Sequence, residues 1–186
     1  GDPGFRPPLA QGIGPRAQNL SGVADNIVLI GFMGAGKSTV GRRLAARLGR
    51  PFVDLDAVIE ETAGMPIPAI FAREGEAGFR EREAAAVRAV AQRKGQVIAT
   101  GGGAVMRRDN LAALRAAGTL VWLRAPLETL LERAKAEGRR PLLAAGEAAA
   151  ARLYDERLPV YALADVVVDA TDDPDAVAAQ IEQRLA

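Results

Sequence analysis

Residues 31–40, GFMGAGKSTV, combine side chains that are well suited to binding phosphate. Gly31, Gly36, Lys37 and Ser38 fit the pattern G-x-x-x-x-G-K-[ST], between a predicted strand and a predicted helix. Glycines let backbone amides converge on a phosphate at a helix N-terminus, lysine supplies a compact cation, and serine supplies a hydroxyl for Mg²⁺. The pattern therefore predicts a nucleotide-binding phosphate loop, but it does not say where the γ-phosphate goes.

Two carboxylates, Asp54 and Asp56, follow in the segment PFVDLD. Read as a strand over residues 51–56, the segment has a side-chain period of two, which places both carboxylates on one side of its carboxyl end. Ligands bind at this edge of open parallel sheets. One carboxylate could then orient the Mg²⁺ shell and the other an acceptor hydroxyl. The alternative is an N-cap for a helix that begins near Ala57.

A run of three glycines, residues 101–103, ends the third predicted strand. Consecutive glycines are costly in chain entropy, and they make sense where a ligand approaches backbone amides. A flexible turn is the alternative.

Arg80 shares a predicted helical face with Glu83, which could hold it in position. Judged by sequence spacing alone, four arginines are more typical of surface residues than of functional-site residues: Arg80, Arg133, Arg140 and Arg157.

The composition excludes several kinds of chemistry. The 186 residues contain no Cys and no His, so thiol chemistry, imidazole catalysis and the usual zinc ligands are absent. A net charge of +1 supplies no field that would attract nucleic acid or an anionic membrane. No apolar run approaches the roughly 20 residues that span a bilayer. We expect a cytoplasmic protein that binds neither nucleic acid nor membrane, with a monomer as the default state.

Strand and helix patterns alternate from Asn26 onward, which predicts an α/β protein. The expected architecture is three-layered, with a five-stranded parallel sheet, a phosphate loop, a helical substrate-binding insertion and a lid. Residues 1–25 read as a disordered N-terminal extension and residues 26–186 as a single kinase domain. Within that domain, residues 56–83 are the expected substrate-binding subdomain and residues 137–151 the expected lid. The five predicted strands cover residues 26–32, 51–56, 96–100, 119–123 and 166–169.

Together these segments resemble the shikimate kinase family of nucleoside-monophosphate-kinase-like P-loop kinases. The resemblance runs from about Asn26 to the C-terminus and leaves the extension uncovered. The phosphate loop is shared with many kinases, whereas the ordered set of D-x-D, F-R-x-x-E, G-G-G and R-P-L-L is specific. The matching segments, in the order of the family, are GFMGAGKSTVGRRLA, FVDLD, GFRERE, VIATGGGAV, RRPLL, ERLPVYALAD and TDDPDAV.

The resemblance implies phosphorylation of the shikimate 3-hydroxyl by ATP with Mg²⁺, a step in making chorismate and the aromatic amino acids. It implies catalytic roles for Lys37, Asp56 and Arg140, with Arg140 coming from the lid, and a Mg²⁺ site at Ser38 and Asp54. The implied nucleotide-binding residues are Gly34, Ala35, Gly36, Lys37, Ser38, Thr39, Arg133, Arg140 and Pro174. The implied shikimate-binding residues are Asp56, Arg80, Gly102, Gly103 and Arg157.

Two other functions remain open at this point. A related kinase could phosphorylate another small hydroxy acid such as gluconate, although two arginines beside a glycine-rich turn suit a ring that bears a carboxylate. A non-catalytic effector-binding domain could use the same fold. That alternative expects the loss of catalytic groups, and the catalytic set is intact.

Overall fold

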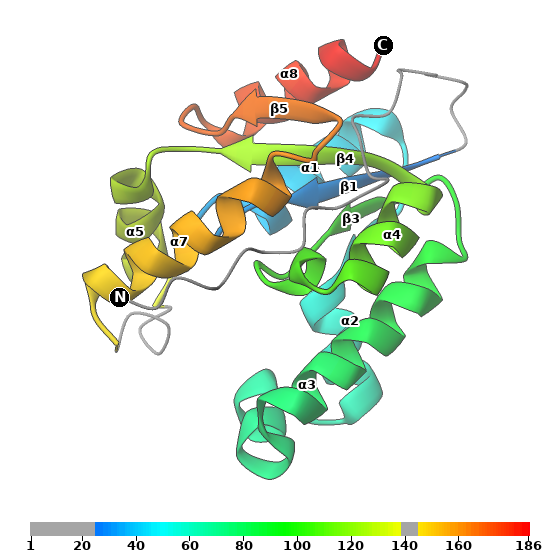
Figure 1. The fold of residues 1–186 in the computed structure, drawn as a ribbon. Helices are drawn as coiled ribbons and strands as arrows, with labels where there is room; N and C mark the ends of the chain where they lie inside the picture. Colours follow the sequence, from blue (N-terminus) through cyan, green and yellow to red (C-terminus); the bar gives the residue numbers. More distant parts are fainter. Residues whose placement is uncertain (1–24, 139–144) are drawn as a thin grey trace.

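The computed structural model describes residues 25–138 and 145–186, and it contains one five-stranded sheet (Figure 1). Every neighbouring pair of strands is parallel, in the order β2-β3-β1-β4-β5, which confirms the predicted α/β sheet. The strands are β1 (Asn26–Ile30), β2 (Phe52–Asp54), β3 (Val97–Ala99), β4 (Gly118–Arg124) and β5 (Val166–Asp169).

The central strand β1 explains why this sheet forms. All five of its residues are buried, and Val28, Leu29 and Ile30 have no exposed surface. A parallel strand that is covered on both faces carries a continuous apolar run, as β1 does. Burial of these side chains supplies most of the driving force for folding at the centre of the molecule.

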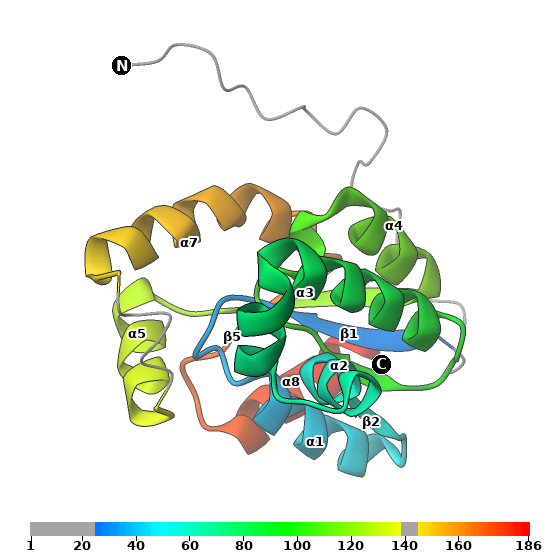
Figure 2. The same ribbon diagram turned by 90° about the horizontal axis from the view of Figure 1, so that it is seen from below.

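Helices cover the sheet on both faces, which makes the fold three-layered (Figures 1 and 2). Helices α1 and α8 pack together on one face, and α3 and α4 pack together on the other. The helices are α1 (Lys37–Leu48), α2 (Leu55–Ala63), α3 (Ile67–Ala91), α4 (Arg108–Ala117), α5 (Leu127–Ala136), α7 (Glu147–Tyr161) and α8 (Pro174–Leu185), with a short 3₁₀ helix, η1 (Ala104–Met106).

The predicted strand over residues 51–56 was wrong at its carboxyl end. Strand β2 ends at Asp54, and helix α2 begins at Leu55. Asp54 is the N-cap of α2, and its Oδ1 accepts a hydrogen bond of 3.0 Å from the backbone N–H of Asp56. The strong preference of Asp for N-caps therefore overrides the strand pattern, and Asp56 lies in the first turn of a helix.

The insertion between β2 and β3 consists of α2 and α3, which pack against each other and extend away from the sheet in Figure 1. Helix α3 is interrupted at Gly75, whose φ of 69° and ψ of −175° are not helical. The second part of α3 contains Arg80 and Glu83, which were predicted to share a helical face. Its Phe79 and Glu83 are buried, so this part of the insertion is fixed to the rest of the protein.

Across residues 25–138 and 145–186, none of the helices is both long enough and apolar enough to cross a membrane.

Candidate active site

The phosphate loop, residues 31–38, connects β1 to α1 and has the backbone conformation that its glycines allow. Gly34 and Gly36 have φ values of 77° and 84°, in the left-handed region that favours glycine. Gly36 is also the N-cap of α1, where it leaves the N–H groups of the first turn without a side-chain cap. Such N–H groups and the positive end of the helix dipole make this position suitable for a phosphate.

Lys37 lies folded back over the phosphate loop. Its Nζ donates hydrogen bonds to the carbonyl oxygens of Gly31 at 2.7 Å and Phe32 at 3.0 Å, and the residue is only 8% exposed. The ammonium is therefore held at the loop by its own backbone. A phosphate bound by the loop would lie within the field of this fixed charge.

Ser38, in the first turn of α1, is hydrogen-bonded to Asp54, the last residue of β2. The Ser38 hydroxyl donates to Oδ2 of Asp54 at 2.7 Å, while Oδ1 of the same carboxylate caps α2. The two groups offer hydroxyl and carboxylate oxygens, which are hard ligands of the kind that Mg²⁺ prefers. The predicted pair is thus brought together beside the phosphate loop.

The glycine turn, residues 101–103, lies against side chains from three other segments. A Cβ atom built on Gly101 would lie 3.0 Å from Oδ1 of Asp56, and one on Gly102 would lie 2.8 Å from Nη1 of Arg157. A Cβ atom on Gly103 would lie 2.8 Å from Nη2 of Arg80. The structure therefore brings together all the residues that were predicted to bind the acceptor.

Arg80 is held in this position by the carboxylate predicted to hold it. Its Nη1 donates to Oε1 of Glu83 at 2.8 Å, and Glu83 is only 2% exposed. Arg157 is held differently, with its Cζ 5.6 Å from the centre of the Phe32 ring. Two cations thus face the same turn from α3 and α7, a pattern suited to a carboxylate because guanidinium groups bind carboxylates through paired hydrogen bonds.

A cavity of about 250 Å³ joins the phosphate loop to the acceptor region. It contains both carboxylates, the lysine and the glycine turn, so that a phosphate on the loop and a hydroxyl near Asp56 would be neighbours. The lining residues are Gly34, Gly36, Lys37, Ser38, Thr39, Asp54, Asp56, Thr100, Gly101, Gly102 and Glu137.

A second cavity, of about 270 Å³, lies on the other side of the phosphate loop. Arg133, Pro174 and Ala35, which the family resemblance implies as nucleotide-binding residues, all line it. Arg133 also donates to the carbonyl oxygens of Ala170 at 2.6 Å and Thr171 at 3.0 Å, which fixes its guanidinium beside the segment after β5. Residues shared by the two cavities are Gly34, Gly36, Thr39 and Glu137.

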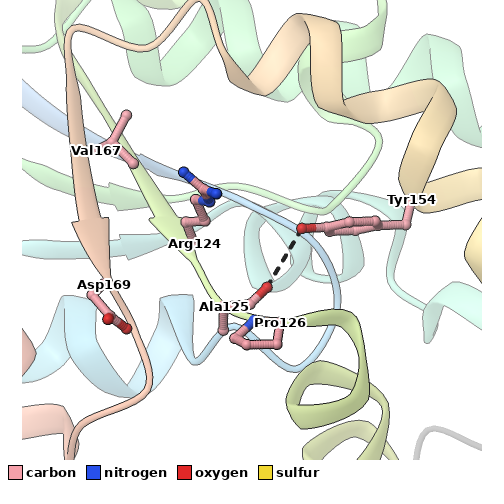
Figure 3. A pocket seen from close by; sticks show the side chains of 6 residues that line it. All are labelled: Arg124, Ala125, Pro126, Tyr154, Val167 and Asp169. Atoms are coloured by element: carbon pink, nitrogen blue, oxygen red, sulfur yellow. Dashed lines mark hydrogen bonds between the residues drawn. The ribbon is translucent and has the colours of Figure 1, made fainter.

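A third cavity, of about 430 Å³, shares no lining residue with the other two (Figure 3). It lies at the carboxyl ends of β4 and β5, with Tyr154 of α7 on one side. The Tyr154 hydroxyl approaches the Ala125 carbonyl oxygen at 3.4 Å, a long hydrogen bond. Its remaining lining residues are Arg124, Pro126, Val167 and Asp169, none of which was predicted to have a role.

Arg140 and most of the predicted lid segment that precedes α7 lie outside the described residues. Two residues of the site were not predicted individually: Glu137, which lines both the 250 Å³ and the 270 Å³ cavity, and Tyr161, whose hydroxyl contacts the glycine turn. No motif marked Glu137. Tyr161 follows Arg157 by four residues, a helical spacing, but this spacing does not indicate a contact with the glycine turn.

The parallel sheet, the phosphate loop and the two cavities that share its residues define a P-loop phosphotransferase. The shikimate kinase family model matches residues 33–186. The chain belongs to the shikimate kinase family.

Curated relatives support the same assignment. The shikimate kinase of Symbiobacterium thermophilum is 52% identical over 79% of this chain and 87% of its own length. That of Paramagnetospirillum magneticum is 45% identical over 95% of this chain and 93% of its own length.

Solved structures of the family superpose well on this chain. Shikimate kinase from Acinetobacter baumannii, in complex with shikimate, has a TM-score of 0.80 at 41% identity and covers 87% of this chain and 92% of its own. A gluconokinase from Sinorhizobium meliloti, with a TM-score of 0.52 at 20% identity over 87% of this chain and 91% of its own, shares the fold alone.

We expect Arg133→Ala to weaken ATP binding about tenfold, because two charge-assisted hydrogen bonds to the segment after β5 are lost along with one wall of the cavity. Titration calorimetry with Mg²⁺ and ATP measures the change. Arg88→Ala removes an exposed arginine from α3 and serves as the matched control. Equal affinities for the two variants would contradict the placement of the nucleotide in this cavity.

Proposed function

We propose that this protein transfers the γ-phosphoryl group of ATP to the 3-hydroxyl of shikimate, which gives shikimate 3-phosphate and ADP. The observation that carries the proposal is the convergence of Arg80, Arg157 and Asp56 on the glycine turn, because Asp56 and the turn also line the cavity at the phosphate loop. This arrangement suits an acceptor that has a carboxylate at one end and a hydroxyl at the other.

In the proposed reaction the two arginines and the glycine turn hold the carboxylate of shikimate. The ring then spans the distance to Asp56, which accepts a hydrogen bond from the 3-hydroxyl and orients its oxygen toward the γ-phosphorus. A new P–O bond forms to that oxygen as the bond to ADP breaks, and the hydroxyl proton leaves by way of Asp56. Orientation is the main contribution of Asp56, because phosphoryl transfer is largely dissociative and gains little from early deprotonation.

The phosphate loop holds the ATP phosphates, and Lys37 stabilises the charge that builds up as the γ-phosphoryl group moves. For this role its ammonium exchanges contacts with the Gly31 and Phe32 carbonyls for contacts with phosphate oxygens. Ser38 and Asp54 would hold Mg²⁺, which would neutralise charge on the β- and γ-phosphates. Arg140 and lid closure over the phosphates remain predictions from the sequence, as do a cytoplasmic location and a monomeric state.

The proposal is tested by a coupled assay for ADP release with shikimate, with gluconate and with no acceptor. ADP release should depend strictly on shikimate. Turnover with gluconate alone would instead support a kinase for a different hydroxy acid. Binding of shikimate without any ADP release would support a non-catalytic effector-binding domain.

Lys37→Ala should reduce kcat by at least about 100-fold, because the variant loses a preorganised cation at the transferring phosphoryl group. Steady-state kinetics with saturating ATP and shikimate measure the effect. Lys94→Ala, which removes an exposed lysine, should behave like the wild type. A kcat for Lys37→Ala close to that of this control would refute the role of the phosphate loop.

Asp56→Asn should reduce kcat by about 100-fold or more while ATP affinity changes little, since the residue acts on the acceptor hydroxyl. The matched control is Asp109→Asn, another acidic residue in the first turn of a helix, which lines neither cavity. A loss confined to ATP affinity would mean that Asp56 belongs to the nucleotide site.

A further inference from the structure

The Tyr161 hydroxyl donates a hydrogen bond to the carbonyl oxygen of Gly102 at 2.7 Å. Tyr161 is the last residue of α7 and has no exposed surface, and Gly102 lies in the glycine turn after β3. The bond therefore joins two segments that are 59 residues apart in the sequence and that both belong to the proposed acceptor site.

The position of this hydroxyl is fixed by the packing of its ring. The Tyr161 ring lies 5.8 Å from the ring of Trp122 in β4, measured between centroids. Both side chains belong to the buried core. Since a close-packed interior leaves little room for a second rotamer, the sheet itself sets where the hydroxyl lies.

The hydrogen bond also determines where a neighbouring amide points. A peptide group is planar and trans, so the Gly102 carbonyl and the Gly103 N–H lie in one plane and point in opposite directions. A carbonyl held by Tyr161 therefore fixes the direction of the Gly103 N–H, which points away from the Tyr161 hydroxyl. The guanidinium groups of Arg80 and Arg157 both lie close to the position that a Gly103 side chain would occupy, so the fixed peptide is next to both cations.

Arg157 lies beside the same hydroxyl, one helical turn before Tyr161 in α7. Burial raises the pKa of Tyr161 to about 12, and the nearby Arg157 charge partly opposes this rise in pKa. The hydroxyl therefore stays protonated, and able to donate, across the range in which kinases are assayed.

We propose that Tyr161 is a positioning residue for the acceptor carboxylate. Its hydroxyl fixes the Gly102–Gly103 peptide and sets the distance between that peptide and Arg157, so that the turn and the guanidinium group keep fixed positions relative to each other. The inference rests on the proposed function, because it assigns Tyr161 to the binding of shikimate. Tyr161 does not touch the substrate.

Tyr161→Phe tests the inference, because it removes the hydroxyl and keeps the ring in the core. We expect KM for shikimate to rise about tenfold, the effect of one lost hydrogen bond and an unsatisfied buried carbonyl. KM for ATP and kcat should stay within about twofold of the wild-type values, since the phosphate loop is unaffected. Steady-state kinetics with each substrate varied in turn, and calorimetric titration with shikimate, give these quantities.

Tyr154→Phe is the matched control. Tyr154 is the only other tyrosine in the chain and lies in the same helix, but its hydroxyl faces the separate cavity of Figure 3. Loss of that hydroxyl should leave both KM values unchanged. Thermal melting of both variants separates positioning from stability, because a purely structural role would lower the melting temperature without raising KM for one substrate.

The outcomes distinguish this inference from the function on which it rests. A wild type without shikimate-dependent ADP release would overturn the proposed function and the inference together. An active wild type with the same shikimate KM as Tyr161→Phe would overturn the inference alone, whatever the melting temperatures. Equal rises in KM for shikimate and ATP would also contradict it, because they would indicate a general disturbance of the site.

Discussion

The site depends on one steric constraint, which is that the glycine turn has no side chains. Asp56, Arg80 and Arg157 approach this turn so closely that a single Cβ atom on residues 101, 102 or 103 would lie 2.8–3.0 Å from one of their polar atoms. Side chains from α2, α3 and α7 therefore lie in close contact with the backbone of the turn, where any side chain on the turn would have to displace them. Because the turn has no side chains, its amides are also accessible to a ligand. This explains why three glycines occur together despite their cost in conformational entropy.

The parallel sheet places the residues of the site at one edge. In a parallel sheet all strands end at one edge, so β1 delivers the phosphate loop, β2 delivers Asp54 and β3 delivers the glycine turn to the same place. Helix α1 begins at the phosphate loop and α2 begins at Asp54, so two helix N-termini also point toward the region where phosphates would bind. The fold thus fixes the positions of the phosphate loop and of the carboxylates and arginines around the glycine turn before any ligand is present.

Much of this arrangement could be predicted from the sequence. Buried parallel strands read as short apolar runs, and the phosphate loop has a pattern with a known mechanism, so the sheet and the loop were predicted correctly. The pairing of Arg80 with Glu83 followed from helical spacing. The strand over residues 51–56 failed because Asp54 serves as an N-cap, a local preference that strand periodicity does not include.

Other features depend on contacts between distant segments and leave no local signal. The approach of Tyr161 to Gly102 accompanies the packing of its ring against Trp122 of β4, and neither residue type alone indicates it. Glu137 lines two cavities only because α5 ends beside the phosphate loop. Such features require the three-dimensional arrangement, whereas periodicity and motifs report on neighbours in sequence.

The most direct test of this account is a crystal structure of the protein with ADP and shikimate bound. The account predicts the shikimate carboxylate within hydrogen-bond distance of Arg80, Arg157 and the amides of the glycine turn, with the 3-hydroxyl facing Asp56 and the cavity of the phosphate loop. Shikimate bound with its carboxylate away from both arginines, or with the 3-hydroxyl remote from Asp56, would contradict it.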